Sequence, residues 1–328
     1  MSETSEHVFA RKTPVTIPVT VIGGFLGAGK TSLVNHLLRH ADGLRIAVLV
    51  NDFGALPIDR DLIVGGDGDE GGDTLEISGG CVCCSYGSDL MDALLDLPRR
   101  RPGLDRVLIE TSGVALPGMV ASSVGLLEAY APGGIVVLAD AEAVRRQAAD
   151  AYLGDTIARQ LAAADLVILN RCDLIAAGAR DETLRWLEEQ APHGRAVPAE
   201  RSVVPVELVL GLRSGDRASN ESSNELRTPG GIAASVLYES IALTLDRPVD
   251  VDRLAQALTT PDAGVLRAKG CLHDTNGRLV TLQIVGRRPE IADAPAGASP
   301  GTLVVIGLRG RLDRAAIDQA ISGRGRAM

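Results

Sequence analysis

The segment Gly24–Thr31 holds the residues whose types and spacing most clearly predict a chemistry. It reads Gly-Phe-Leu-Gly-Ala-Gly-Lys-Thr and fits G-x-x-x-x-G-K-[ST], the pattern of a loop that binds nucleoside triphosphates. Glycines let backbone N–H groups curve round an anion, and the helix predicted to follow adds partial positive charge. A chance glycine-rich turn is the alternative, but the strand-like run Val19–Ile22 directly ahead favours the phosphate loop.

Two side chains of this loop have expected roles toward the triphosphate. Lys30 can reach the β- and γ-phosphate oxygens, and the Thr31 hydroxyl can bind Mg²⁺. Carboxylates after later strands, Glu110 and Asp52, are further Mg²⁺ candidates, and Gly113 can donate its N–H to the γ-phosphate. We predict that Lys30, Thr31 and Glu110 are catalytic and that Thr31, Asp52 and Glu110 bind Mg²⁺. Nucleotide contacts are predicted at Gly24, Gly27, Ala28, Gly29, Lys30, Thr31, Ser32, Asn170 and Asp173.

The tetrapeptide Asn170–Asp173 is similar to the N-K-x-D element with which GTPases read guanine. A carboxylate at Asp173 can accept from guanine N1–H and the exocyclic amine together. Adenine lacks that pair of donors, so Asp173 would select GTP, while Asn170 would brace the loop. Arg171 replaces the usual lysine, but arginine can stack flat on a ring. Because the pattern is short, a plain loop stays open as the alternative.

Cys81, Cys83 and Cys84 follow two glycines and form a C-x-C-C cluster. Three thiolates this close can converge on one soft cation, with bonds of about 2.3 Å. Thiolates favour Zn²⁺ or Cu⁺ and can take Co²⁺ or Ni²⁺. One tetrahedral position is left for an acid such as Glu76, a water or a partner, which suits a protein that passes metal on. A redox couple and buried apolar cysteines remain alternatives.

The elements that must position these residues alternate along residues 15–210. Uniformly apolar strands and intervening helices predict a doubly wound, mainly parallel α/β sheet. The residues that directly follow its strands should gather at one edge of the sheet. The predicted strands are Val19–Ile22, Ile46–Val50, Val107–Ile109, Ile135–Ala139, Leu166–Leu169 and Val203–Val206. The predicted helices are Leu33–Arg39, Leu90–Leu97, Thr156–Ala163 and Thr183–Gln190.

The rest of the chain is predicted to comprise a polar tail at 1–14, a flexible linker at 211–233 and a smaller α+β domain at 234–328. Asn276-Gly277 predicts a hairpin turn within that domain. Its predicted strands are Val236–Leu245, Val265–Leu272, Leu279–Val285 and Thr302–Leu308. Its predicted helices are Val251–Leu258 and a final helix capped by Asp313 that ends at Ser322.

Composition excludes several classes of function. With 45% hydrophobic and 23% charged residues, the 328-residue chain has the balance of a soluble globular protein. A net charge of −9 disfavours nucleic-acid binding, and 2% aromatics leave few platforms for stacked bases. No apolar run approaches the roughly 18 residues that span a bilayer, and residues 1–14 lack the apolar core of a signal peptide. We therefore expect a cytoplasmic protein with reduced thiols that binds neither membranes nor nucleic acid.

Four other side chains invite a metal or redox interpretation. His36 and His40 are spaced i, i+4 and could pair on a metal, but the outer face of the first helix is the preferred placement. Cys172 occupies the free position of N-x-x-D and needs no role. Cys271 lies in a predicted strand and is expected in the core.

Taken in order, these motifs resemble the CobW-type P-loop GTPases, relatives of the urease and hydrogenase nickel accessory GTPases. The resemblance covers nearly the whole chain and implies a P-loop NTPase fold with a CobW-like C-terminal domain. It also implies a GTP-dependent metallochaperone with Mg²⁺-GTP at the phosphate loop and a transition metal at C-x-C-C. The residues that carry it are Gly23–Thr31, Asn51–Gly54, Gly80–Cys84, Glu110–Gly113, Asn170–Asp173 and Arg267–Leu272.

The sequence departs from the family pattern at several positions. Asp52 and Ala55 stand where many members have glutamate, and Arg171 where the usual residue is lysine. The predicted linker has no histidine-rich tract of the kind that many members carry, which argues against metal storage there.

We therefore expect a GTPase that holds zinc, with cobalt or nickel as alternatives, and hydrolyses GTP to deliver the metal to a client metalloprotein. A homodimer is compatible with the sequence. Two other classes stay open: an ATP-using small-molecule kinase, and a nucleotide-binding metal sensor or scaffold without useful turnover.

Overall fold

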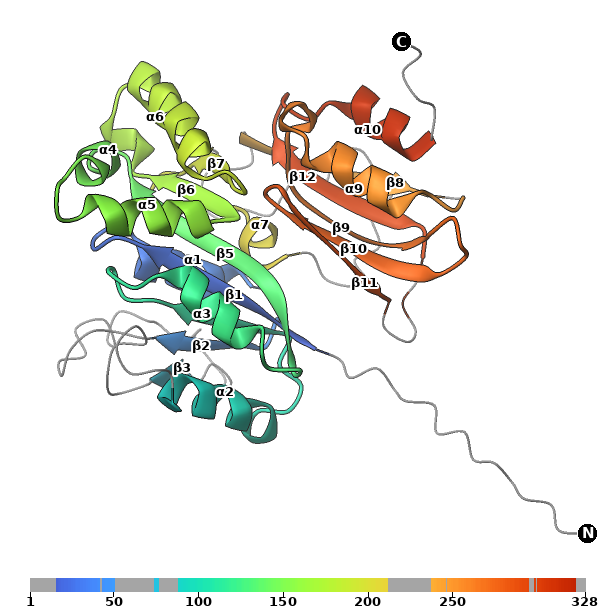
Figure 1. Cartoon of the computed structure of the whole chain (residues 1–328), viewed down its shortest axis with the longest axis horizontal. Helices are drawn as coiled ribbons and strands as arrows, with labels where there is room; N and C mark the ends of the chain where they lie inside the picture. Colours follow the sequence, from blue (N-terminus) through green and yellow to red (C-terminus); the bar gives the residue numbers. More distant parts are fainter. Residues whose placement is uncertain are drawn as a thin grey trace, which may run out of the picture.

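Two β-sheets organise the part of the chain that the computed structural model describes (Figure 1). The structure describes residues 16–41, 43–50, 74–76, 88–211, 237–245, 247–294, 298 and 300–322. Within these ranges, no helix is long and apolar enough to cross a membrane.

The first sheet has seven strands, all parallel, in the order β3-β2-β4-β1-β5-β6-β7. On one side of β1 the chain forms β2 and β3 and then returns as β4, which lies between β2 and β1, and on the other side β5, β6 and β7 follow in order, as in doubly wound sheets. Strands such as β2 and β6 are nearly uniformly apolar because helices cover both faces. The strands are β1 (Ile17–Gly24), β2 (Ile46–Val50), β3 (Thr74–Glu76), β4 (Arg106–Glu110), β5 (Tyr130–Asp140), β6 (Leu166–Asn170) and β7 (Arg195–Pro198).

Helices pack on the two faces of this sheet through separate apolar clusters. One face carries α1 and the short α7, and the opposite face carries α2, α3, α5 and α6 (Figure 1). The helices are α1 (Lys30–His40), α2 (Ser88–Arg100), α3 (Pro117–Val124), α4 (Val144–Ala148), α5 (Gly154–Ala163), α6 (Ala177–Gln190) and α7 (Val206–Leu210).

The second sheet is antiparallel, in the order β11-β10-β9-β12-β8. Its apolar face is covered by α9 (Val251–Thr259) and α10 (Arg314–Ser322). The Asp313 carboxylate accepts from the Ala316 N–H at 2.9 Å at the start of α10, which confirms the predicted cap. The strands are β8 (Tyr238–Thr244), β9 (Val265–His273), β10 (Leu279–Val285), β11 (Arg288–Asp293) and β12 (Thr302–Leu308).

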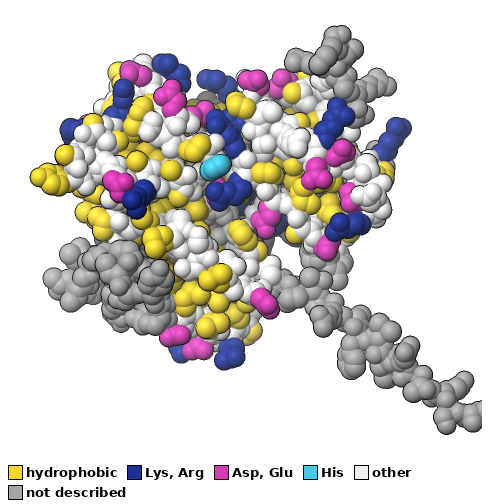
Figure 2. Space-filling model, viewed as in Figure 1, with side chains coloured by type: hydrophobic (Ala, Val, Ile, Leu, Met, Phe, Trp, Pro, Cys, Tyr) yellow, Lys and Arg dark blue, Asp and Glu magenta, His cyan; other side chains and the backbone are white. Residues whose placement is uncertain are grey.

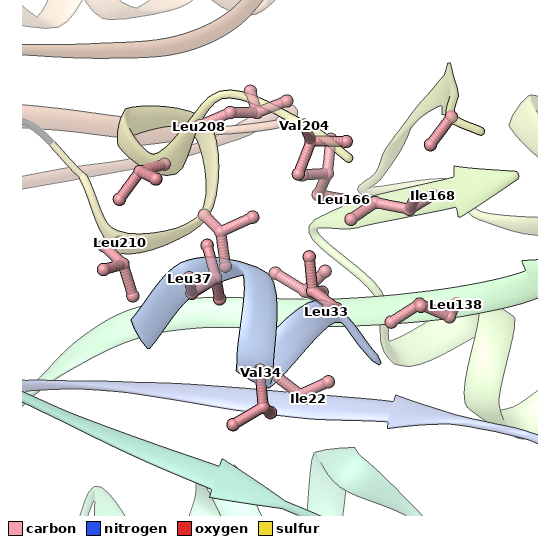
Figure 3. Close-up of a cluster of buried hydrophobic side chains, with 14 of the residues drawn as sticks. Ile22, Leu33, Val34, Leu37, Leu138, Leu166, Ile168, Val204, Leu208 and Leu210 are labelled. Carbon is pink, nitrogen blue, oxygen red and sulfur yellow. The ribbon is translucent and has the colours of Figure 1, made fainter. Parts of the chain in front are cut away.

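One hydrophobic cluster joins the two sheets. Leu33 and Leu37 of α1 pack with Leu208 of α7 above the strands of the first sheet (Figure 3). The second sheet contributes Tyr238, Leu266 and Ile306 to the same cluster. Each large side chain buried in this way stabilises the fold by about 1.5–3 kcal/mol. The two sheets are therefore held together by packing as well as by the connecting chain.

Polar contacts reinforce the same boundary. The guanidinium of Arg267 is buried and donates to the carbonyl oxygens of Leu208 at 2.9 Å and Val209 at 3.1 Å. Arg288 pairs at 3.1 Å with Asp165, whose side chain is 2% exposed. Basic side chains gather along the visible seam between the two units (Figure 2). The carboxyl end of α7 is thus capped by a cation from the second sheet.

The structure confirms the parallel α/β sheet followed by an antiparallel sheet with helices, but one predicted strand is wrong. Val203 makes only an isolated bridge with Glu200, and Val206 begins α7. The final strand is instead β7, which lies earlier in the chain. Pro205 has no N–H to donate to a ladder, and a short apolar run does not distinguish a buried strand from a buried helix.

Several predicted regions lie outside the described residues. They include the polar tail at 1–14 and, apart from Gly211, the linker at 211–233. The domain boundaries therefore stay predictions.

Candidate nucleotide-binding site

The carboxyl ends of four strands meet at one edge of the first sheet. Glu110, Asp140 and Asn170 are the last residues of β4, β5 and β6. Ile22 of β1 lies opposite Glu110 in the register. The predicted gathering of these residues is therefore confirmed, while Asn51 and Asp52 lie outside the described residues.

The backbone of the phosphate loop requires glycine at specific positions. Gly24 and Gly29 have φ values of 128° and 104°, which side chains on L-residues rarely allow. A Cβ atom at Gly24 would also meet the carbonyl oxygen of Leu138. Gly29 is the N-cap of α1, so the helix begins at Lys30 with its N-terminal amides beside the loop.

Lys30 lies across the loop in which it is predicted to act. Its side chain is buried, and Nζ donates to the carbonyl oxygen of Phe25 at 3.3 Å. The ammonium is therefore held against the backbone of the predicted phosphate loop, as its predicted role toward the phosphates requires.

Thr31 and Glu110 bring two oxygen atoms together. The Thr31 hydroxyl donates to Oε1 of Glu110 at 2.8 Å, and Glu110 is 4% exposed. Hydroxyl and carboxylate oxygens are the ligands that Mg²⁺ prefers. Ser112, two residues further along, is also buried, and its Oγ makes no hydrogen bond to any part of the chain that the structure describes. These oxygens fit a hydrated cation beside a triphosphate.

Asn170 connects β6 to the phosphate loop. Its Nδ2 donates to the carbonyl oxygen of Ala28 at 2.9 Å and to Oγ of Ser202 at 2.8 Å. The backbone N–H of Ser202 donates to Oδ1 of Asn170 at 2.7 Å, and the Ser202 hydroxyl donates to the Gly29 carbonyl at 3.1 Å. Sequence reasoning missed Ser202 because the residues around it carry no motif.

The three side chains of the turn after Asn170 differ in their partners and in their exposure. Arg171 has a φ of 63°, and its guanidinium pairs with the Asp140 carboxylate at 2.6 Å. Cys172 is buried, which raises the pKa of its thiol, and the S–H donates to the carbonyl oxygen of Leu169 at 3.1 Å. Asp173 lies in a short 3₁₀ turn and is exposed. Its carboxylate is therefore accessible to a ligand.

The loop that follows Glu110 packs directly on the phosphate loop. A Cβ atom at Gly113 would lie 2.7 Å from the backbone nitrogen of Leu26, so only glycine fits there. This close approach brings the Gly113 amide beside the segment predicted to hold the phosphates.

The predicted outward placement of His36 is wrong. His36 is 7% exposed, and its Nε2 lies 2.8 Å from the carbonyl oxygen of Val204. The nitrogen donates to that carbonyl, because a carbonyl oxygen can only accept. The segment that precedes α7 covers this face of α1, a contact between parts of the chain 168 residues apart that helical spacing cannot predict.

The predicted transition-metal ligands Cys81, Cys83 and Cys84 lie outside the described residues, as does Asp52. Within the described ranges, no three or more His, Cys, Asp or Glu side chains form a group that could hold a metal. The C-x-C-C site therefore stays a prediction.

Comparisons with known proteins match both halves of the chain. Residues 18–198 match the family described as CobW/HypB/UreG, nucleotide-binding domain, and residues 238–323 match the cobalamin synthesis protein cobW C-terminal domain. A protein from Sinorhizobium named zinc chaperone CobW is 32% identical over 95% of this chain and 98% of its own length. Zinc chaperone YjiA of Escherichia coli is 31% identical over 78% of this chain and 81% of its own. The solved structure of zinc-bound YjiA GTPase is 24% identical, covers 94% of this chain and 99% of that one, and has a TM-score of 0.41.

Proposed function

Because the chain belongs to the CobW/HypB/UreG family of GTPases, we propose that it is a GTP-dependent metallochaperone that carries zinc to a client metalloprotein. The observation that carries this proposal is the meeting of Thr31 and Glu110 beside the phosphate loop, in a chain whose zinc-chaperone relatives match it over most of its length.

Several groups at the edge of the sheet are suited to bind and stabilise the triphosphate. The amides of the phosphate loop and the N-terminus of α1 bind the phosphates, and Lys30 neutralises charge on the β- and γ-phosphates. Thr31, Glu110 and Asp52 would hold Mg²⁺, which would supply positive charge to stabilise the triphosphate. After Gly113 the chain reads Val-Ala-Leu, with no glutamine to orient the attacking water, so slow intrinsic turnover is expected.

The turn at Asn170–Asp173 supports a preference for guanine. Asn170 is fixed against the phosphate loop, and Asp173 exposes its carboxylate. The pairing of Arg171 with Asp140 holds the guanidinium at the end of β5, from which its flat face can stack on a base. These features support GTP over ATP, and family membership likewise disfavours a small-molecule kinase.

The cargo is proposed to bind Cys81, Cys83 and Cys84, with Glu76 as a candidate fourth ligand. Zinc is favoured by thiolate chemistry and by the names of the relatives, and cobalt or nickel are alternatives. These cysteines lie in sequence between β3 and α2, and β3 pairs with β2, the neighbour of β4. Ordering of flanking segments by the γ-phosphate could therefore change the geometry of the thiols.

The thiolate chemistry also indicates the cellular compartment. Thiols stay reduced and available to metal in the cytoplasm, so we place the protein there. Its proposed partner is a client metalloprotein. A second copy of the chain is a further candidate partner, and gel filtration tests for such a dimer.

The test compares zinc binding and GTP hydrolysis in the wild type and in a Cys81→Ser, Cys83→Ser, Cys84→Ser variant. The variant should lose its stoichiometric Zn²⁺ and keep its affinity for GTP. Cys271→Ser is the matched control, because Cys271 lies in β9 of the second sheet. Unchanged zinc affinity in the triple variant would contradict the cargo site. Absence of client-stimulated hydrolysis would favour a sensor or scaffold.

A further inference from the structure

Gln160 of α5 is a buried polar side chain that the chemistry described above does not use. It is 1% exposed, and its Nε2 donates to the carbonyl oxygens of Gly113 at 3.1 Å and Ala115 at 2.8 Å. Two carbonyl acceptors fix the orientation of the carboxamide, because only its NH₂ group can donate to both. Both acceptors belong to the loop that follows Glu110.

The buried side chains that surround Gln160 on α5 are otherwise apolar. Its neighbours Ile157 and Leu161 are buried in a hydrophobic cluster that also packs against Phe25 of the phosphate loop. A buried carboxamide without partners would destabilise the fold, so its presence here depends on the two loop carbonyls. The side chain therefore joins α5 to one specific stretch of backbone.

The same stretch also packs closely against the phosphate loop and the strand that leads into it. Gly113 leaves no room for a side chain beside Leu26 of the phosphate loop, and a Cβ atom at Gly23, near the end of β1, would lie 2.8 Å from Cγ of Pro117. Residues 113–117 thus contact Gln160 of α5, the phosphate loop and the end of β1.

We propose that Gln160 is a positioning residue for the γ-phosphate of GTP. The proposal rests on the proposed role of this loop in binding GTP. By fixing the carbonyls of Gly113 and Ala115 toward α5, Gln160 limits rotation of the peptides around Gly113. The Gly113 amide and the Ser112 hydroxyl, which is buried and makes no hydrogen bond within the described chain, are then kept in place for the additional phosphate oxygens. GDP has no γ-phosphate and does not need this arrangement.

We expect replacement of Gln160 to weaken the binding of GTP more than the binding of GDP. Loss of the two hydrogen bonds should weaken binding of a non-hydrolysable GTP analogue about 10- to 100-fold, the range expected for two hydrogen bonds. Binding of GDP should change less than about 2-fold. A residue that served only to stabilise the fold would affect both nucleotides alike.

The experiment measures the affinities for GDP and for the GTP analogue, with Mg²⁺ present, in Gln160→Met and Gln160→Glu. Methionine keeps the length of the side chain without donors, and glutamate keeps its shape but presents acceptors to two carbonyls. Gln283→Met is the matched control. Gln283 also donates to a carbonyl, that of Pro132 at 3.1 Å, but near the start of β5 and away from the phosphate loop.

The ratio of the affinity for the GTP analogue to the affinity for GDP decides the outcome. Because both are measured on one preparation, the ratio does not depend on the fraction of folded protein. A fall in the ratio in both Gln160 variants but not in Gln283→Met supports the proposal, and an unchanged ratio overturns it. Failure of the proposed chaperone function is a separate result, since it would appear in the wild type as nucleotide binding without zinc binding or GTP hydrolysis.

Discussion

The Oγ1 atom of Thr31 lies 2.8 Å from Oε1 of Glu110, although the two residues are 79 positions apart. This contact joins the first turn of α1 to the end of β4. It brings together a hydroxyl and a carboxylate that we propose as Mg²⁺ ligands, and it links the phosphate loop to the strand that leads into the loop containing Gly113.

Replacement of Glu110 by Gln should reduce GTP hydrolysis by at least about 10- to 100-fold, the loss typical when even a residue hydrogen-bonded to a metal ligand, as Glu110 is to Thr31, is replaced. The amide preserves the hydrogen bond with Thr31 but removes the negative charge that favours Mg²⁺. The reduction should be partly reversed at high Mg²⁺ concentration. Steady-state hydrolysis as a function of Mg²⁺ measures both effects. An unchanged Mg²⁺ dependence would exclude Glu110 from the site.

Replacement of Asp173 by Asn should remove most of the preference for GTP over ATP. The exposed carboxylate is proposed to accept two hydrogen bonds from guanine, and loss of a charged acceptor corresponds to about 1.5–3 kcal/mol, or roughly 10- to 100-fold in affinity. Competition of GTP and ATP for a fluorescent nucleotide measures the preference. Asp181→Asn, an exposed aspartate on α6, is the control. Retention of full selectivity in Asp173→Asn would show that the base is read elsewhere.

Replacement of Arg267 by Met should lower the free energy of unfolding by about 2–4 kcal/mol, because the carbonyls of Leu208 and Val209 would lose their buried partner. Burial and the nearby Arg106 lower the pKa of Arg267 to about 9, so the guanidinium is still charged at neutral pH. Denaturant unfolding measures the change. Arg314→Met is the control, since its 4.0 Å pair with Asp318 is exposed and should contribute less than about 1 kcal/mol.

Stability should decrease as the pH falls below about 6.5, in part because of His36. Burial, together with nearby His40 and Arg39, lowers the pKa of His36 from 6.5, although the hydrogen bond to Val204 opposes the shift. The unfolded chain therefore takes up the proton first, and acidification favours unfolding until the pH reaches the lowered pKa of the folded state. Well above pH 6.5 the histidine is neutral in both states and has no such effect.

Thermal unfolding between pH 5 and 8 tests this dependence. His36→Gln should flatten the slope, whereas replacement of exposed His273 by Gln should leave it unchanged. Equal slopes in the wild type and His36→Gln would assign the acid sensitivity to other groups.

Much of the first sheet and its functional edge could be predicted from sequence. The buried strands are uniform aliphatic runs, and β1 is followed at once by glycines, Lys30 and Thr31 in a fixed pattern. The placement of Glu110 and Asn170 followed from the rule that parallel strands present their carboxyl ends at one edge.

The features of the site that could not be predicted from sequence depend on contacts between segments that are distant in the chain. Ser202 acts through Asn170, 32 positions away, and Gln160 through Gly113, 47 positions away. A polar residue between apolar Ile157 and Leu161 was the only local signal for Gln160. β11 contains Pro289 and charged residues, a composition tolerated at the edge of a sheet but not typical of strands, and it was not predicted.

The central claim is that nucleotide and metal binding are coupled. Titration of Zn²⁺ into the protein loaded with a non-hydrolysable GTP analogue, and separately with GDP, tests it directly. We predict that the two zinc affinities differ by about 5- to 150-fold, and that zinc changes the affinity for the GTP analogue relative to GDP by the same factor. Equal zinc affinities in the two nucleotide states would contradict the account.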